Sequence, residues 1–556
     1  MKLYFAQDST SAPYDENRYS KIRPVDTGWN DFGFSFQAVA DVVVPGKPGI
    51  QLRMFVVPWN RGLLSNKVSG WLVKSLKVTP GTAHLAIGEG HRFFSILRAD
   101  GYERIVEWAG EDRKLLEDVL SLFHDIVFFR WKGRSSDSIK EFLASDAAIL
   151  GVFRDETAYL NYHRAWRILA GARVDATDAR GNFEFECNLP GYSGVHKAAF
   201  KFAVPQPLSD RCHAIIGENG VGKTRFLKEL VVSLGALSGV SREILCGEAK
   251  AMGKLRYESH DAAIGRVVVL SWGVGANYPE ETPITNGFEY THYSIADLGS
   301  LGGSRRRDNE LSMLAQIIRD PRTERGSSRL QLFEKAVSSC LSLKEIAVCL
   351  LSGKERRWVS IASLIAGSEQ DRLDKIGRID PSGSLKYWHG NGVAPFSSGQ
   401  SAMLSFAVRA VCSITPGTLL ILDEPEIHLH PSMVAALMKA LHELLEEAES
   451  IALIATHSPF VARELPTSCV HVLRCDSQRV PAFSTPYLRT LGASVDNLSI
   501  DVFNDAGVHK FYHETASKIS MISSSMEEVI ERFGQQISVE MLSLVRSYME
   551  KKNAIS

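Results

Sequence analysis

The residues with the clearest capacity for chemistry form a glycine-rich loop behind an apolar run. Cys212–Ile216 is followed by Gly-Glu-Asn-Gly-Val-Gly-Lys-Thr, a complete G-x-x-x-x-G-K-T sequence. Such a loop points backbone N–H groups at phosphates, and the helix after it adds partial positive charge. We therefore expect ATP to bind through Gly217, Glu218, Asn219, Gly220, Val221, Gly222, Lys223, Thr224 and Arg225.

Two side chains of this loop have distinct predicted roles. Lys223 is placed to reach the β- and γ-phosphates, and the Thr224 hydroxyl is a ligand for Mg²⁺. The segment that follows has apolar residues at helical spacing, namely Leu227, Leu230, Val231 and Leu234. The loop therefore stands in the strand-loop-helix context that this motif requires.

A second apolar run, Thr418–Leu422, ends in two acids, Asp423 and Glu424, and is closed by Pro425. A buried parallel strand delivers such carboxylates to the carboxyl edge of its sheet. We expect Asp423 to hold Mg²⁺ and Glu424 to act as the general base on the attacking water. A solvated strand end is the plain alternative, and the upstream phosphate loop argues against it.

Two further groups complete the candidate site. Ser397, Ser398, Gly399 and Gln400 open an apolar-faced helix, where hydroxyl and N–H groups are able to bind a phosphate, although any capped helix shows a similar sequence. His457 follows the strand Ile451–Thr456, and we expect it to contact the γ-phosphate during catalysis together with Lys223 and Glu424.

The order of these four motifs resembles that of the ATP-binding-cassette ATPases, in the non-transporter branch related to SMC, RecF and the OLD nucleases. The string Asp-Glu-Pro-Glu-Ile-His-Leu-His-Pro, residues 423–431, is similar to one typical of that branch. The resemblance implies an α/β P-loop head of two lobes and a head-to-tail dimer. In that dimer, ATP lies between Gly217–Thr224 of one copy and Ser397–Gln400 of the other.

The sequence also departs from the family pattern. Ser398 stands where the signature normally has its first glycine, and Ser271-Trp272 stands where a glutamine normally follows the next strand. About 170 residues separate Thr224 from Phe396, too few for the coiled-coil arms of SMC proteins. We therefore expect a compact, mainly helical insertion between the two lobes.

These motifs divide the chain into five expected segments. The first is a mixed α/β N-terminal domain without a catalytic signature, and the last is a helical C-terminal region with apolar residues at helical spacing from Met526 onward. The segments are 1–175 (N-terminal domain), 176–300 (lobe with the phosphate loop), 301–395 (insertion), 396–475 (lobe with the signature, acids and histidine) and 476–556 (C-terminal region).

Two stretches have the residue types that bind nucleic acid. Arg305, Arg306 and Arg307, with later arginines up to Arg329, are candidate contacts to a nucleic-acid backbone or to ATP, and a solvated loop is an equally good interpretation. Residues 128–134 interleave aromatic and basic residues, and we interpret them as a buried strand that runs into a solvated loop.

Composition excludes several classes of protein. The 556 residues include 63 Lys and Arg against 64 Asp and Glu, so the net charge is −1, without the basic excess of a DNA-coating protein. We find no secretion signal and no apolar run of membrane-spanning length, and the eight cysteines are scattered. A cytoplasmic protein with reduced thiols and no membrane contact is predicted.

OLD nucleases carry a metal-binding Toprim domain after the ATPase head. Only about 80 residues follow Cys475 here, without Asp-x-Asp at a strand end, so no nuclease site is expected in this chain. The chain resembles most the PtuA-type ATPase subunits of Septu and retron anti-phage systems. That resemblance implies a separate HNH nuclease as partner, a reverse transcriptase with its msDNA in retrons, and contact with DNA. A RecF- or SMC-like repair ATPase and an ATP-locked scaffold remain alternatives.

Overall fold

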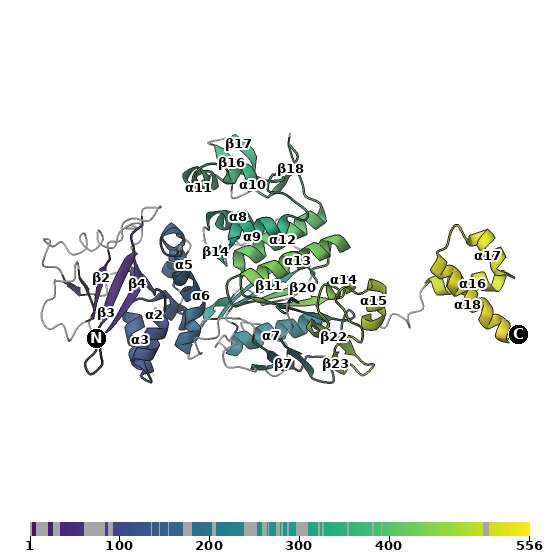
Figure 1. Ribbon diagram of the computed structural model, residues 1–556, viewed down its shortest axis with the longest axis horizontal. Coiled ribbons are helices and arrows are strands. Elements are labelled where there is room, and N and C mark those ends of the chain that lie inside the picture. Colours follow the sequence, from purple (N-terminus) through teal and green to yellow (C-terminus); the bar gives the residue numbers. More distant parts are fainter. Residues whose placement is uncertain are drawn as a thin grey trace. The chain divides into compact units, whose positions relative to one another are not determined.

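A computed structural model shows that the chain forms two compact units, Met1–Ala493 and Ser494–Ser556 (Figure 1). The structure describes residues 3–555 with gaps. The residues left out are 1–2, 7–19, 26–33, 60–83, 87–92, 171–180, 203–206, 238–252, 258–263, 274–277, 296–309, 504–510 and 556, and eleven gaps of one or two residues at 135, 144, 154, 265, 280–281, 286–287, 321–322, 325–326, 353–354, 381–382 and 391.

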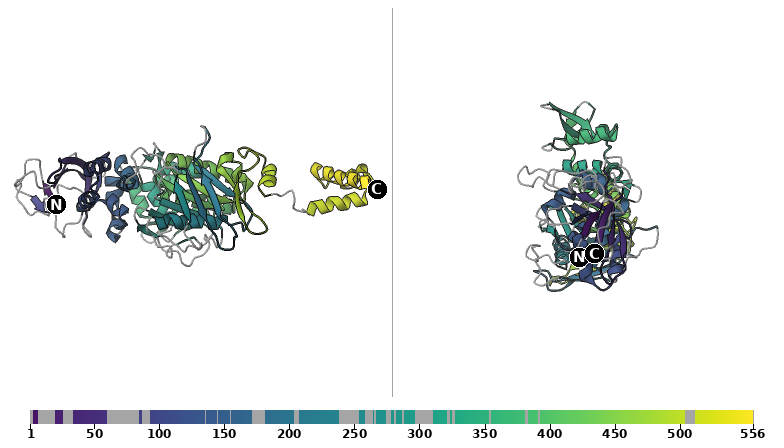
Figure 2. Two further views of the ribbon diagram at one scale, coloured as in Figure 1. Left: turned by 90° about the horizontal axis from the view of Figure 1, so that it is seen from below. Right: turned by 90° about the vertical axis from the view of Figure 1, so that its left-hand side faces the viewer.

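A large sheet lies at the centre of the first unit (Figure 2). It has eight strands in the order β12-β13-β11-β20-β21-β9-β22-β23. Neighbouring strands are parallel except at the edge pairs β12–β13 and β22–β23. The inner strands are buried apolar runs, as expected where both faces of a parallel sheet are covered. The strands are β9 Cys212–Ile216, β11 Arg266–Ser271, β12 Thr282–Thr285, β13 Phe288–Ser294, β20 Thr418–Asp423, β21 Ile451–Thr456, β22 Val470–Cys475 and β23 Pro481–Ser484.

The register of this sheet brings the expected site residues to one edge. Asp423 of β20 pairs with Ser271 of β11 on one side and with Ala455 of β21 on the other. Ala455 pairs in turn with Ile215, two residues before the phosphate loop. The carboxyl ends of β9, β20 and β21 are therefore level with one another, as the sequence predicts.

Helices and a smaller sheet cover the two faces. On one face lie α7, Lys223–Leu237, and a three-stranded sheet of β7 Phe183–Cys187, β8 His196–Phe200 and β10 Lys254–Tyr257, whose aromatic residues share a core with the central strands. On the other face lie α12, Ser398–Ser413, and α13, Pro431–Glu447 (Figure 1). The helices expected after the phosphate loop and after the signature are thus confirmed. Short elements α14, Pro459–Ala462, and η2, Thr467–Cys469, follow β21.

The segment between the lobes contains more strand than predicted. Beside its helices it has a four-stranded antiparallel sheet in the order β17-β16-β18-β19, so the expectation of a mainly helical insertion missed a sheet. The helices are α8 Glu310–Arg319, α9 Arg329–Val337, α10 Ile361–Ile365 and α11 Glu369–Gly377, and the strands are β14 Thr323–Glu324, β15 Ser327–Ser328, β16 Ile346–Ser352, β17 Glu355–Ser360, β18 Lys386–Trp388 and β19 Val393–Ala394. Helices α8 and α9 pack against α12.

The N-terminal domain is a mixed α/β domain, as predicted, with a six-stranded sheet in the order β5-β1-β2-β3-β4-β6. Strands β3 and β4 form an antiparallel hairpin. The strands are β1 Leu3–Ala6, β2 Ser20–Pro24, β3 Gln37–Val42, β4 Ile50–Pro58, β5 His84–Ala86 and β6 Phe93–Leu97, and the helices are α2 Gly101–Ala109, α3 Arg113–Leu122, α4 Ile126–Trp131, α5 Asp137–Leu143, the π-helix η1 Ala147–Val152 and α6 Glu156–Ala170.

The strand expected over residues 128–129 is wrong, because this stretch belongs to helix α4. The carboxylate of Asp125 caps the helix by accepting a hydrogen bond from the Phe128 N–H at 2.8 Å. Arg130 is buried and donates to the Tyr162 carbonyl at 3.0 Å, so it does not serve a nucleic-acid surface.

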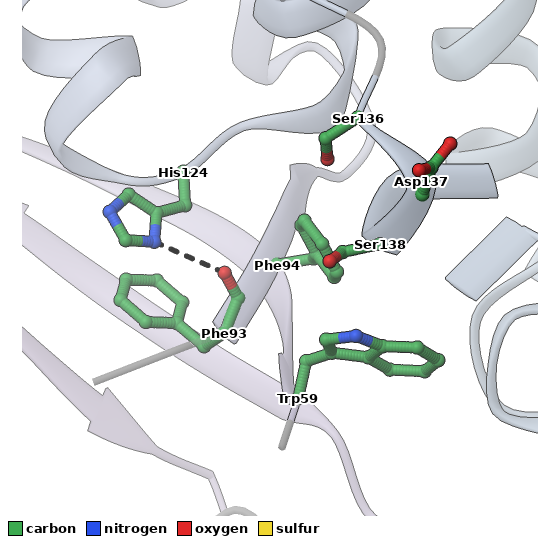
Figure 3. Close-up of a pocket in the computed structure, with 7 residues that line it drawn as sticks. All are labelled: Trp59, Phe93, Phe94, His124, Ser136, Asp137 and Ser138. Carbon is green, nitrogen blue, oxygen red and sulfur yellow. Dashed lines mark hydrogen bonds between the residues drawn. The ribbon is translucent and has the colours of Figure 1, made fainter. Parts of the chain in front are cut away.

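The same domain holds a pocket of about 440 Å³ lined by Trp59, Phe93, Phe94, His124 and residues 136–138 (Figure 3). The His124 ring stacks on Phe93 with centroids 4.6 Å apart, and its Nδ1 lies 3.2 Å from the Phe93 carbonyl oxygen. Burial lowers the pKa of His124. None of the site residues predicted from the sequence lines this pocket.

The second unit is helical, and its core is small. The helices are α15 Val495–Phe503, α16 Phe511–Ile522, α17 Met526–Phe533 and α18 Val539–Ile555. Val529 and Val545 pack with Ala516 and Ile519, which confirms the helices predicted from Met526 onward.

Strand β23, in the first unit, lies in the stretch from 476 that was expected to be helical, so the central sheet continues further along the chain than predicted. Among the described helices, none is long and apolar enough to cross a membrane.

Candidate nucleotide-binding site

The phosphate loop connects β9 to α7 and depends on its glycines. A Cβ at Gly217 would lie 2.3 Å from the Leu473 carbonyl oxygen, far inside contact distance. Gly222 has φ +104°, a conformation that other residues rarely adopt, and a Cβ there would meet the Tyr192 hydroxyl at 3.0 Å. The same hydroxyl donates to the Gly220 carbonyl at 2.7 Å. The loop is therefore closed on its inner side by neighbouring groups and open at Glu218, Asn219 and Gly220, which are exposed.

Lys223 lies folded over the loop from the first turn of α7. Its Nζ donates to the carbonyl oxygens of Gly217 at 2.8 Å and Glu218 at 2.9 Å. Burial lowers the pKa of Lys223, while the nearby carboxylates, Glu424 first among them, act in the opposite direction. The ammonium group is thus held at the mouth of the loop, beside the helix N-terminus, where an anionic phosphate would replace carbonyl oxygens as its partner.

Thr224 and Asp423 meet across the edge of the sheet. The Thr224 hydroxyl donates to Asp423 Oδ1 at 3.0 Å, and the Tyr278 hydroxyl donates to Oδ2 at 3.2 Å. Asp423 is buried, and burial raises its pKa to about 6. A buried carboxylate next to a hydroxyl is an all-oxygen donor pair suited to a hard cation, and a cation would offset the desolvation of the carboxylate. These residues therefore fit Mg²⁺.

Glu424 has an unusual backbone conformation for a glutamate, with φ +56°. Its N–H donates to the Ala455 carbonyl at 2.8 Å, which fastens the turn after β20 to the neighbouring strand β21. The side chain is about 25% exposed, in contrast with the buried Asp423 before it. The two acids consequently differ in environment, one suited to a cation and the other accessible to water.

His457 stands next to two glutamates at the end of β21. Its Nδ1 lies 3.8 Å from Glu424 Oε1 and 3.3 Å from Glu426 Oε1. The ring is about 42% exposed, so it is available to a ligand above the sheet edge. The structure thus brings Lys223, Thr224, Asp423, Glu424 and His457 together, as the sequence predicts.

Glu426 is a site residue that the sequence analysis did not single out. Its Oε1 accepts hydrogen bonds from the Thr456 hydroxyl at 2.6 Å and from the His457 N–H at 2.9 Å, and its side chain is about 7% exposed. It joins the turn after β20 to the end of β21. The available signal was the acid three positions after Asp423 in the string of residues 423–431.

The loop after β11 also reaches Asp423, although it lacks the glutamine of the family pattern. The Trp272 N–H donates to the Asp423 carbonyl oxygen at 3.1 Å, and Tyr278 contacts the carboxylate as described above. Ser271 pairs instead with His292, with Oγ and Nε2 2.8 Å apart. Nothing in the sequence around Tyr278 marked it, because this tyrosine belongs to no motif that the sequence analysis recognises.

The Ser-Ser-Gly-Gln sequence forms the first turn of α12. Ser397 is the N-cap, its hydroxyl accepting from the Gln400 N–H at 3.3 Å while Gln400 Oε1 accepts from the Ser397 N–H at 3.0 Å. A Cβ at Gly399 would lie 2.7 Å from the Met433 sulfur of α13. Ser397 and Ser398 are exposed. Within the described part of the chain, Ser397 and Gln400 form these hydrogen bonds with each other and not with the phosphate loop.

The arginines predicted as nucleic-acid contacts have different outcomes. Arg305, Arg306 and Arg307 lie outside the described residues. Arg329 is buried in a network of carbonyl oxygens, so a role for it in gripping nucleic acid is wrong. Arg225, which was predicted to bind ATP and not nucleic acid, is exposed beside the phosphate loop and donates to the Pro190 carbonyl at 3.4 Å.

Part of the chain matches a protein family. The family model described as "AAA domain, putative AbiEii toxin, Type IV TA system" matches residues 363–463, a stretch that includes the signature, both acids and His457. The chain is also similar to protein ea59 of Escherichia phage lambda, with 25% identity over 445 residues, or 78% of this chain and 79% of that protein.

Several solved structures are similar to this chain at lower sequence identity. An SMC head bound to the C-winged helix domain of ScpA has 14% identity and a TM-score of 0.30, covering 55% of this chain and 97% of that one. The SMC head domain from Thermotoga maritima has 12% identity and a TM-score of 0.27, covering 56% and 100%. Stu0660 of Streptococcus thermophilus has 10% identity and a TM-score of 0.28, covering 66% and 93%. The chain's own strand order and phosphate loop give the fold as an α/β P-loop ATPase head with additional domains.

Proposed function

We propose that this chain is an ATP-binding and ATP-hydrolysing subunit of the ABC type. The observation that carries the proposal is the meeting of Lys223, the Thr224–Asp423 pair and Glu424 at one edge of the central sheet. A phosphate loop alone supports binding. The partly exposed glutamate beside a buried carboxylate supports hydrolysis as well, because the two acids are in environments that suit different tasks.

The chemistry follows from the positions of these groups. The loop N–H groups and Lys223 bind the phosphates of ATP, with the ammonium leaving the carbonyl oxygens of Gly217 and Glu218 for phosphate oxygens. Thr224 and Asp423 would hold Mg²⁺, which neutralises phosphate charge when bound. Glu424 takes the proton of the attacking water, and His457, next to it, donates a hydrogen bond to the γ-phosphate.

The signature turn takes part through a second copy of the chain. Ser397 and Ser398 are exposed at the N-terminus of α12, a helix of 16 residues, so their hydroxyls and the free N–H groups of the first turn are available to an anion. We propose that they meet the γ-phosphate of ATP bound to the partner head. ATP then closes a head-to-tail dimer and hydrolysis opens it.

The biological setting that we propose is anti-phage defence, in which the ATPase controls a separate nuclease of the HNH type. Two findings support a role in conflict between phage and host. The description of the matching family names a toxin, and a similar protein, ea59, is encoded by phage lambda. The proposed partners also include a reverse transcriptase with its msDNA, and DNA. Purification of the chain with the products of its neighbouring genes tests this. A complex containing neither a nuclease nor a reverse transcriptase would argue against it.

Direct titration with ATP tests the binding site. Lys223→Ala removes the charged donor from the loop, and a charge-assisted hydrogen bond contributes about 1.5–3 kcal/mol, so ATP affinity should fall by about 10- to 100-fold. Lys439→Ala, on the exposed face of α13, is a matched control that should bind ATP like the wild type. Wild-type affinity in Lys223→Ala would refute the role of the loop.

A further inference from the structure

Arg329, the first residue of α9, is a buried cation at a junction of three parts of the chain. Its side chain is about 4% exposed, and its Nε lies 3.1 Å from the buried Asp320 carboxylate. Its guanidinium donates to the carbonyl oxygens of Val411, Cys412 and Ile414, at the C-terminal end of α12. It also donates to the Tyr159 hydroxyl at 2.9 Å. The last of these contacts connects the junction to the N-terminal domain.

The contacts with α12 have a clear physical basis. The last four carbonyl groups of a helix have no partner within it, and they carry partial negative charge. A planar guanidinium with five donors satisfies several of them at once, and Asp320 neutralises the buried charge. Arg329 therefore fixes the position of the C-terminal end of α12.

The opposite end of α12 carries the signature. The helix has 16 residues, which corresponds to about 24 Å at 1.5 Å per residue, and it begins at the capping box of Ser397 and Gln400. Its middle is buried against the central sheet and α13. A helix packed in this way moves as a rod, so the placement of its C-terminal end affects the placement of Ser397–Gln400.

The N-terminal domain is attached to this helix by α6. Tyr159 is buried in the hydrophobic core of that domain, with its ring 6.3 Å from that of Phe153. One turn along α6, the carbonyl of Tyr162 accepts from Arg130, which also lies 3.3 Å from Glu289 of β13. Helix α6 is therefore linked to the ATPase head at two places. Glu289 lies at the start of its strand, at the sheet edge opposite the phosphate loop.

We propose that Arg329 is a positioning residue for the signature helix and that, through Tyr159, it couples the N-terminal domain to the pairing of ATP-bound heads. A change in the core of the N-terminal domain alters the position of α12 through Tyr159 and Arg329, and it leaves the contacts of the ATP-binding loop unchanged. The coupling rests on the proposed ATPase function. It predicts that disturbing the junction changes turnover while ATP binding by a single head is unaffected.

The test compares two tyrosine variants of the full chain. Tyr159→Phe removes the hydroxyl that contacts Arg329, and Tyr487→Phe removes a hydroxyl from an exposed side chain outside the junction. Couplings of this kind change an equilibrium by about 2- to 30-fold. We expect kcat of Tyr159→Phe to fall within that range, with the Kd for ATP in dilute protein within about twofold of the wild type. Tyr487→Phe should keep both values.

Hydrogen exchange of the α12 amides gives a second measurement that does not depend on activity. Tyr159→Phe should exchange faster than Tyr487→Phe over residues 398–413, with α13 unchanged. If the wild type hydrolyses ATP, and Tyr159→Phe matches the control in both kcat and exchange, the coupling is refuted and the ATPase proposal stands. If the wild type does not hydrolyse ATP, the proposed function fails, and α12 exchange alone decides the coupling: unchanged exchange overturns it.

Discussion

Glu426 offers a sharp test of how the site is assembled, because it contacts the Thr456 hydroxyl and the N–H and ring of His457 rather than substrate. The Glu426→Ala substitution removes the acceptor of two hydrogen bonds, from the Thr456 hydroxyl at 2.6 Å and from the His457 N–H at 2.9 Å. It leaves the phosphate loop and Lys223 in place. Glu426→Gln is the matched control, since an amide oxygen still accepts both bonds.

The structure sets the size of the effect. Hydrogen bonds to a charged acceptor contribute about 1.5–3 kcal/mol each, and the two share one oxygen, so the loss is about 2–4 kcal/mol rather than the full sum. If most of that loss raises the activation free energy of hydrolysis, because His457 no longer contacts the reacting phosphate correctly, kcat falls by about 30- to 1000-fold. The Kd for ATP should stay within about threefold, because binding depends on the loop.

The assay is steady-state ATP turnover together with direct titration of ATP for both variants. Glu426→Gln should retain at least a third of wild-type kcat, because the loss corresponds to about the cost of one weakened hydrogen bond. Two results would refute the reasoning. One is a Glu426→Ala kcat within twofold of the wild type, and the other is equal loss in Ala and Gln, which would assign the effect to the negative charge.

Three further predictions follow from other parts of the structure. Gly217→Ala places a Cβ 2.3 Å from the Leu473 carbonyl, so ATP affinity should drop at least tenfold, by about 1.4 kcal/mol or more, and unchanged titration curves would contradict this. Tyr278→Phe removes a hydrogen-bond donor to Asp423, so the Mg²⁺ concentration that gives half-maximal turnover should rise a few-fold. A half-saturating concentration equal to that of the wild type would count against it. Burial raises the pKa of Asp125 to about 7, so the folded state binds its proton more tightly than the unfolded state, and stability falls as pH rises from about 4 to 7. Asp125→Asn lacks this slope, and its melting temperature relative to the wild type should rise from pH 5 to pH 8; parallel curves would exclude the effect.

The central site was predictable because its residues are fixed to strand ends. Apolar runs identified β9, β20 and β21, and parallel strands bring their carboxyl ends to one edge, so Lys223, Asp423, Glu424 and His457 had to be neighbours. The side-chain contacts between neighbouring turns were not predictable in the same way. Glu426 reaches across to β21, and Tyr278 comes from a loop with no motif.

Two errors have local physical causes. Residues 126–131 are rich in β-branched and aromatic side chains, which favour strands, yet they form α4, capped by Asp125 and packed in the domain core. Arg329 belongs to a run of arginines that suggested a phosphate-binding surface. Its actual partners are carbonyl groups at the end of a helix, 82 and 83 residues away in sequence. Burial decided both cases, and burial depends on distant parts of the chain.

The fate of Glu424→Gln with ATP and Mg²⁺ tests the central claim most directly. Sedimentation of this variant, in parallel with turnover measurements, reports binding, pairing and hydrolysis together. We predict that the variant binds ATP, accumulates as a dimer only when ATP is present, and turns over at least 100-fold more slowly than the wild type, a loss of about 2.7 kcal/mol in transition-state stabilisation. Wild-type turnover in Glu424→Gln, or a sedimentation profile that ATP leaves unchanged, would contradict the account.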